Sequence, residues 1–213
     1  MIKTKITVGH SNIADFLQKY QNVEHFLAYC KQCQNYNSKW SCPPLAVNPR
    51  TYLDDYSEIY LIGLQMFYDE ETKRQVNTKE KIVDFSAKLL RKMKNKFSDE
   101  LLTIEKEFPN TVSFSSGGCA WCCKCTRSSG QPCRKPEKMR YSLDSFGIDL
   151  GKVTEEFLNI KLLWGLDKLP DYHTLFHALA VKDDTDGEIL QKRLENLSIE
   201  AETVILPVVL VKK

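Results

Sequence analysis

The sequence predicts a single α/β domain over residues 1–213, with a mixed sheet flanked by helices and two cysteine-bearing metal loops at residues 30–44 and 117–136. Segments with the two-residue periodicity of strands alternate with segments of helical periodicity, as in α/β domains. No internal repeat or low-complexity linker divides the chain, and 213 residues fit one domain. The 42% hydrophobic and 27% charged residues exclude disorder as the main state. The strand order is not readable from these patterns.

The first segment is expected to form a strand followed by a helix. Residues 2–8 alternate like a strand, and Ser11 stands where a helix N-cap would, before apolar residues at helical spacing over residues 13–27. This helix would carry Cys30 near its end. Cys33 then begins a polar turn, so the first cysteine group is predicted to lie on a loop.

Three elements are predicted in the middle of the chain: a short helical segment at residues 48–49, a buried strand at residues 58–67 and a long amphipathic helix. The helix has apolar side chains along one face of residues 78–97 and continues towards Phe108, where Pro109 ends it. Its opposite face carries lysines and arginines, which we expect to be solvated.

The last part of the chain holds four further expected elements. Residues 111–114 are a strand candidate that leads into the second cysteine group, and residues 137–147 have a helical pattern. Residues 175–181 fit either a helix or a strand, and residues 183–187 form a turn. Residues 203–211 predict a final apolar strand.

The charge and hydropathy of the chain indicate which partners and which compartment to expect. Thirty basic against 28 acidic residues leave a net charge of +2, which gives no strong field for binding nucleic acid or a membrane surface. The first ten residues lack the apolar region of a secretory signal, so a cytoplasmic location is expected. Residues 204–211 are far shorter than the roughly 20 apolar residues of a membrane span.

Several familiar motifs are incomplete. Residues 184–187 resemble the middle of a calcium loop, but Lys182 and Arg193 occupy its first and last ligand positions. His173 and His177 have the i, i+4 spacing of a zinc-protease helix without its glutamate base, and are interpreted as ordinary histidines. No G-x-G-x-x-G or P-loop signature is present.

Cysteine is the residue type whose pattern indicates chemistry. The eight cysteines form two groups, Cys30, Cys33 and Cys42, then Cys119, Cys122, Cys123, Cys125 and Cys133. In a reducing compartment, closely spaced thiols indicate metal ligation or redox chemistry rather than disulfides. Free cysteines also pack as small hydrophobes, but packing alone explains this clustering poorly.

The second group predicts an iron–sulfur cluster. Cys119, Cys122 and Cys125 have successive C-x2-C spacing, which lets a tight loop place each sulfur on a different iron, and Cys133 would close the fourth corner of a [4Fe-4S] cubane. Structural zinc more often uses two separate C-x2-C pairs, and remains the alternative. Cys123 is adjacent to Cys122, so it either points elsewhere or replaces Cys122, and it is predicted not to be a primary ligand.

The first group offers only three thiolates, from Cys30, Cys33 and Cys42. It would hold a second metal centre or complete the first. An open iron would bind substrate, water or a partner's ligand, whereas a fourth ligand such as Cys123 or Cys133 would close the site for electron transfer. The sequence leaves these alternatives open.

Residues around the second group suit a negatively charged cluster. Basic side chains that would offset its charge, or would simply be solvated, are Lys124, Arg127, Arg134, Lys135 and Arg140. Gly117 and Gly118 would let backbone amides approach the sulfurs, and Trp40 and Trp121 would exclude water or belong to the core.

These features resemble a family of bacterial and archaeal proteins described as predicted metal-binding proteins, a domain of unknown function. The resemblance covers residues 29–150 and rests on Cys30, Cys33, Cys42-Pro43-Pro44, Gly117-Gly118-Cys119, Cys122, Cys125, Pro132-Cys133-Arg134, Pro136, Arg140, Ser142 and Gly147-Ile148-Asp149. It implies seven metal-ligand cysteines on an α/β scaffold, with iron–sulfur binding and no settled reaction. Asp144 stands where the resemblance leads us to expect Glu more often, and either acid would pair with Arg140 or face solvent.

Three functions follow from these residues. The leading hypothesis is a cytoplasmic iron–sulfur protein that passes single electrons to or from a partner protein or enzyme, which requires no general acid or base. One alternative is an enzyme whose three-cysteine site binds substrate near Arg134, Arg140 and Asp149. The other is a structural zinc module for protein interaction. No catalytic residue is assigned, and neither nucleic acid nor membrane is an expected partner.

Overall fold

The computed structural model describes residues 2–165, 167–197, 199 and 202–205. Its elements in chain order are β1 (Ile2–Asn12), α1 (Ile13–Tyr20), α2 (Val23–Gln32), β2 (Glu58–Tyr68), α3 (Glu70–Gln75), α4 (Lys79–Glu107), β3 (Thr111–Phe114), the 3-10 helices η1 (Thr126–Ser129) and η2 (Leu143–Phe146), α5 (Leu150–Leu158), β4 (Tyr172–Val181), α6 (Gly187–Glu195) and β5 (Glu202–Ile205). The alternation of strands and helices confirms the predicted α/β class.

The strands form one sheet in the order β3-β4-β2-β1-β5. The pairs β1–β2, β2–β4 and β3–β4 are antiparallel, whereas β5 lies parallel to β1. The sheet is therefore mixed, as predicted. At its centre Ile62 of β2 pairs with Val8 of β1 on one side and with His177 of β4 on the other.

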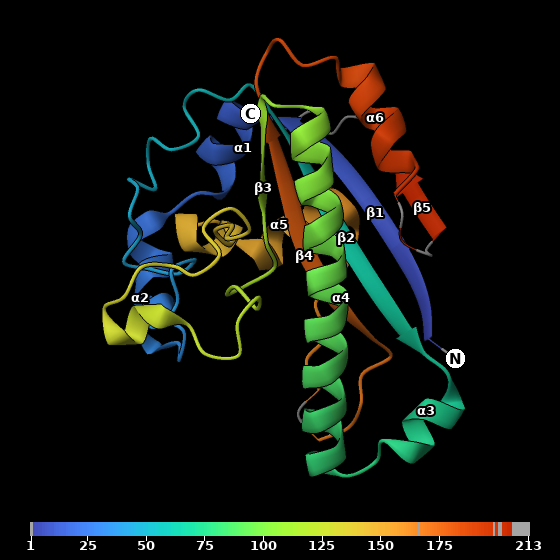
Figure 1. Cartoon of the computed structure of the whole chain (residues 1–213). Coiled ribbons are helices and arrows are strands. Elements are labelled where there is room, and N and C mark those ends of the chain that lie inside the picture. The colour runs from blue at the N-terminus through green and yellow to red at the C-terminus, as the bar shows by residue number, and fades with distance from the viewer. Residues whose placement is uncertain (1, 166, 198, 200–201, 206–213) are drawn as a thin grey trace.

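Helices cover both faces of this sheet, with α4 in front of β4 and β2 in the view of Figure 1 and α5 behind them. On the face of α1 and α5, Leu61 packs in one core with Phe16 and Phe157. On the face of α4 and α6, Ile62 packs in a second core with Phe97. Alternate residues of β2 enter opposite cores, which explains why the strand is largely apolar.

The helix expected over residues 13–27 is two helices. α1 ends at Tyr20, and the next residue, Gln21, forms a β-bridge with Ile148. Asn22 then caps α2, because its side chain accepts a hydrogen bond from the backbone of His25 (3.1 Å). The cap of α1 is Asn12 rather than Ser11, which lies in β1.

Residues 137–147 do not form the expected helix. They contain turns and the short η2, which ends at Gly147 with φ 78°. A Cβ at Gly147 would lie 2.5 Å from the Cα of Val23, so the close approach of η2 to α2 requires glycine here. The expected piece at residues 48–49 is also a series of turns, with the amide of Tyr52 donating to Asn48 (3.0 Å).

The ambiguous residues 175–181 lie in β4, because pairing with both β2 and β3 satisfies the backbone of a strand. Of the strand expected at residues 203–211, residues 203–205 belong to β5, and residues 206–211 lie outside the described residues. Among the helices that the structure describes, none is long and apolar enough to cross a membrane.

Candidate metal centre

The two cysteine loops lie against each other beside the edge strand β3. The loop after α2 carries Cys42, and the loop after β3 carries Cys119. Ser41, which is fully buried, accepts a hydrogen bond from the backbone N–H of Cys119 (2.7 Å). The ammonium group of Lys39 donates to the carbonyl of Cys119 (3.0 Å). A Cβ at Gly118 would lie 3.0 Å from the Lys39 side chain, so the glycine lets the loops approach closely.

Arg127 fastens the same two loops from the other side. Its guanidinium donates to the carbonyls of Lys39 (3.0 Å), Cys42 (2.7 Å) and Pro44 (2.5 Å). It also lies over the ring of Trp40, 5.1 Å from the centroid. Its charge was expected to offset a cluster, but the structure directs it to backbone carbonyls of the first loop.

One cavity is lined by the second cysteine group and has a volume of about 50 Å³. The residues around it are Lys39, Trp40, Cys119, Trp121, Cys122, Cys123, Cys125, Thr126, Cys133, Arg134, Lys135 and Met139. Burial raises the pKa of Cys119, and the nearby thiolates of Cys133, Cys122 and Cys125 raise it further. The four predicted ligands are thus electrostatic neighbours in one cavity, which has room for more than one water molecule.

Cys123 lies at the rim of this cavity and is exposed. Arg91 of α4 donates to its sulfur (3.6 Å), and this hydrogen bond lowers the pKa of Cys123. The side chain is turned towards α4, so its exclusion from the ligand set stays a prediction that this geometry favours.

A second cavity, of about 250 Å³, is lined by the first cysteine group. Its lining is Phe26, Tyr29, Cys30, Cys33, Asn35, Tyr36, Cys42, Pro43, Gly117, Gly118, Ser142, Asp144 and Ser145. Burial raises the pKa of Cys30 to about 11, and the charges of Asp144 and Cys42 add to the effect. Burial likewise raises the pKa of Cys42. The backbone N–H of Asn35 donates to the sulfur of Cys33 (3.5 Å). Cys133 and Cys123 line the other cavity, so the structure does not bring either into this group.

The cysteines are unpaired. None of the eight, all within the described part of the chain, forms a disulfide. Within the described residues, no three His, Cys, Asp or Glu side chains lie close enough together to hold a single metal ion. The structure thus divides free thiols between the two cavities.

A partly buried cation that the sequence analysis missed lies beside the cysteine loops. Lys94 of α4 donates to the carbonyls of Ser116 (3.0 Å) and Gly118 (2.8 Å), and burial lowers its pKa. The signal in the sequence was its position, because Lys94 falls on the apolar stripe of α4 between Leu90 and Phe97.

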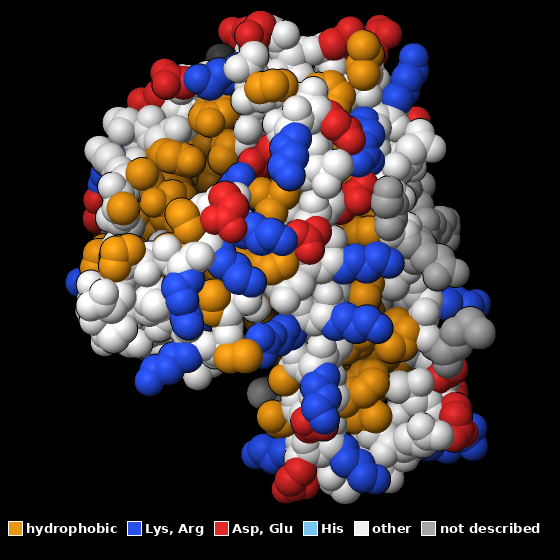
Figure 2. All heavy atoms as spheres, viewed as in Figure 1, with side chains coloured by type: hydrophobic (Ala, Val, Ile, Leu, Met, Phe, Trp, Pro, Cys, Tyr) orange, Lys and Arg blue, Asp and Glu red, His pale blue; other side chains and the backbone are white. Residues whose placement is uncertain are grey.

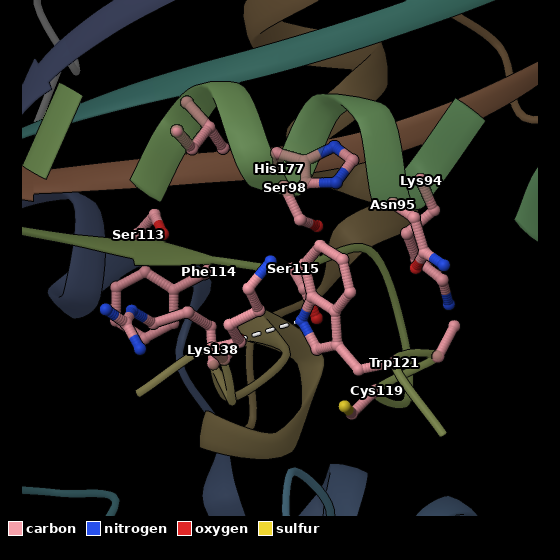
Figure 3. A pocket seen from close by; sticks show the side chains of 13 residues that line it. Lys94, Asn95, Ser98, Ser113, Phe114, Ser115, Cys119, Trp121, Lys138 and His177 are labelled. Atoms are coloured by element: carbon pink, nitrogen blue, oxygen red, sulfur yellow. Dashed lines mark hydrogen bonds between the residues drawn. The ribbon is translucent and has the colours of Figure 1, made fainter. Parts of the chain in front are cut away.

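Figure 3 shows the small cavity of about 10 Å³ where Lys94 lies, between α4, β3 and the second cysteine loop. Trp121 crosses this region, and its indole N–H donates to the carbonyl of Lys138 (2.8 Å, dashed). Cys119 lines the same cavity, and its side chain lies near that of Trp121 in Figure 3.

The other residues singled out in the sequence have structural contacts. Arg140 forms an ion pair with Glu105 (2.5 Å) instead of Asp144, and Asp149 caps α5 by accepting from the amide of Lys152 (3.0 Å). Neither Arg140 nor Asp149 lines the three-cysteine cavity. The ring of His177 is buried beside Phe97, with centroids 4.7 Å apart. The Nδ1 atom of His173 hydrogen-bonds the hydroxyl of Tyr68 (2.6 Å).

The outer face of α4 is basic. Figure 2 shows lysine and arginine side chains spread along this helix in the middle of the view. Its exposed basic residues are Lys79, Lys81, Lys88, Arg91, Lys92, Lys96 and Lys106. This confirms that the basic face is solvated.

An α/β scaffold with two cysteine-lined cavities defines a metal-binding class of protein, since clustered unpaired thiols are typical metal ligands. The sequence pattern of the family described as "Predicted metal-binding protein (DUF2284)" matches residues 17–176. The chain belongs to this family, and both cysteine groups lie within the matched residues. No curated protein and no solved structure matches the chain.

Proposed function

We propose that the protein is a cytoplasmic iron–sulfur protein that transfers single electrons. Cys119, Cys122, Cys125 and Cys133 would hold a [4Fe-4S] cluster, and the group of Cys30, Cys33 and Cys42 would hold a second centre. The observation that carries the proposal is the division of the sulfurs into two adjacent cavities, each lined by one cysteine group. A cluster supplies the redox chemistry, while the chain positions the thiolates and excludes water.

The spacing of the cysteines along the chain supports clusters over structural zinc. Cys119, Cys122 and Cys125 have successive C-x2-C spacing, which lets each sulfur reach a different iron of one cluster. Structural zinc more often uses two separate C-x2-C pairs that approach one ion from opposite sides.

The surroundings support transfer to a partner protein with an acidic surface. Lys124, Arg134 and Lys135 of the second loop are exposed next to the four-cysteine cavity, and the exposed Arg91 contacts Cys123 at its rim. Opposite charges steer the encounter of redox partners, and salt screens this attraction. Electron transfer to an acidic partner should therefore slow as ionic strength rises.

The second candidate function is an enzyme with an open iron at the three-cysteine site. The cavity of about 250 Å³ favours it, because that volume exceeds the cavity at the four-cysteine site and approaches the size of small-molecule sites. Such an enzyme would bind its substrate between Tyr36 and Cys30.

The test is anaerobic purification of the full chain, followed by measurement of iron, sulfide and zinc and by visible absorption. We expect brown protein with equal amounts of iron and sulfide. Cys122→Ser should lose the metal of one centre, whereas the adjacent Cys123→Ser, the matched control, should retain all of it. Colourless protein with stoichiometric zinc would refute the proposal, and equal metal loss in both variants would refute the ligand set.

A further inference from the structure

Asp144 occupies an unexpected place in the three-cysteine cavity. The sequence suggested that this acid pairs with Arg140 or faces solvent, but Arg140 is bound to Glu105. Asp144 lines the cavity together with Cys30, Cys33 and Cys42. Its Oδ1 atom is buried and makes no hydrogen bond within the described residues.

The carboxyl group is held there by a rigid piece of backbone. Leu143 and Phe146, on either side of it in η2, are buried in the core, and Gly147 packs directly on Val23 of α2. The hydroxyl of Ser145, which also lines the cavity, donates to the carbonyl of Ser142 (2.6 Å) rather than to the carboxylate. Neighbouring groups thus fix the position of Asp144 without satisfying it.

The nearby cations are also committed elsewhere. Lys94 donates to two backbone carbonyls of the second loop, and Lys39 donates to the carbonyl of Cys119. A buried carboxylate oxygen without a partner is unfavourable. An iron ion in this cavity would give that oxygen a partner.

We propose that the Asp144 carboxylate is the fourth protein ligand of a [4Fe-4S] cluster whose other three ligands are Cys30, Cys33 and Cys42. The inference rests on the proposed function. Three thiolates leave one iron of the cubane without a protein ligand, and the unpartnered oxygen in the same cavity completes the set. The site is then closed, which suits electron transfer, and one of its irons has an oxygen ligand.

The experiment compares the wild-type chain with Asp144→Ala, Asp144→Cys and the control Asp149→Asn, all purified anaerobically. Asp149 is five residues along the chain, caps α5 and lies outside the cavity lining, and asparagine is an equally good cap. Each protein is analysed for iron and sulfide, then treated with ferricyanide and examined by EPR. In this step the cubane gives one electron to ferricyanide and releases one Fe²⁺, which leaves a [3Fe-4S] cluster.

We expect Asp144→Ala to form the [3Fe-4S] signal under conditions in which the wild type and Asp149→Asn keep their clusters. Asp144→Cys should resist this loss, because a thiolate replaces the carboxylate. Cyanide added to the reduced proteins should change the EPR spectrum of Asp144→Ala and leave that of the wild type unchanged.

Two results would overturn the assignment while the proposed function stands. In the first, the wild type holds two clusters, and Asp144→Ala has the same iron content and resists ferricyanide as well as the wild type does. In the second, the wild-type cluster already binds cyanide, which would show an open iron. This measurement needs only the wild type, so it decides the question even if Asp144→Ala fails to fold. A wild-type chain without iron and sulfide would instead overturn the proposed function, and this assignment with it.

Discussion

Replacing Arg127 should loosen the junction between the two cysteine loops. Its guanidinium reaches three backbone carbonyls of the first loop, those of Lys39, Cys42 and Pro44, from a 3-10 helix in the second loop. It also stacks on Trp40. Arg127→Ala removes all of these contacts at once and leaves the cysteines in place.

The expected loss of stability follows from these contacts. A hydrogen bond to a charged group contributes about 1.5–3 kcal/mol, but Arg127 is only half-buried, so water replaces part of what the mutation removes. The stacking on Trp40 adds about 0.5–1 kcal/mol. We therefore expect a total loss of about 3 kcal/mol. Arg127→Lys keeps the charge without the planar fork and should lose roughly half as much.

The assay is anaerobic urea unfolding of the chain as purified, followed by far-UV circular dichroism. Midpoints are compared at equal metal content, because a bound cofactor couples its release to unfolding. Arg74→Ala is the matched control. Arg74 is an exposed arginine of α3, so its replacement should change stability by less than about 0.5 kcal/mol.

The order of the urea midpoints tests whether the Arg127 guanidinium stabilises the junction of the two loops. We expect the urea midpoints of the wild type and Arg74→Ala to coincide, that of Arg127→Lys to be lower, and that of Arg127→Ala to be the lowest. If Arg127→Ala unfolds at the wild-type midpoint, the guanidinium does not hold the loops together, and the adjacency of the two cavities needs another cause.

Three further predictions concern other buried polar groups. Ser41→Ala leaves the amide of Cys119 without its acceptor and should cost about 1–3 kcal/mol in urea unfolding; an unchanged midpoint would contradict the contact. Glu105→Gln breaks the half-buried ion pair with Arg140 and should cost about 2 kcal/mol in the same assay, and no loss would mean that the pair contributes nothing net. Burial lowers the pKa of His177 to about 3, so the unfolded chain binds the extra proton below about pH 6.5 and stability should fall by about 1.4 kcal/mol per pH unit from there to about pH 3. In His177→Phe the stability should fall less steeply with decreasing pH over this range, and an equally steep fall in the variant would show that other groups cause it.

The sequence was most informative where the signal is local. Residues 58–67 were predicted as a buried strand and form β2, which extends one residue further to Tyr68. Pro109 correctly ended the long helix, since α4 stops at Glu107 with Phe108 as its cap. Periodicity and proline act within a few residues, so one sequence carries them in full.

Elements that depend on distant partners were missed or wrong. The apolar spacing over residues 13–27 continues through Asn22, so periodicity could not reveal the break that the bridge of Gln21 to Ile148 imposes. The pattern over residues 137–147 suggested a helix, but Arg140 is drawn to Glu105 of α4 and Ser142 forms a bridge with Ser115. Tertiary contacts override local propensity at these places.

The candidate site, too, was predictable from the sequence only where the signal is local. Spacing alone grouped the cysteines, and the structure places each group around its own cavity, although their role as ligands stays a prediction. Asp144 reaches the three-cysteine cavity, and Lys94 the small cavity beside Cys119, from segments without cysteine. Their roles depend on which segments fold together, and a single sequence does not state this.

Ser41 links the two cysteine loops. Its hydroxyl accepts the N–H of Cys119 (2.7 Å) and lies 3.7 Å from the sulfur of Cys42. A hydroxyl has one proton, and a metal-bound thiolate only accepts, so ligation of Cys42 would fix the direction of the chain from Cys119 N–H through Ser41 to the sulfur. A change in charge on Cys42 would then alter the hydrogen bond at Cys119. Because hydrogen bonds to sulfur help to set cluster potentials, Ser41 would, under the proposed function, influence the potential of the centre at Cys42 while it holds the backbone of Cys119 at the other.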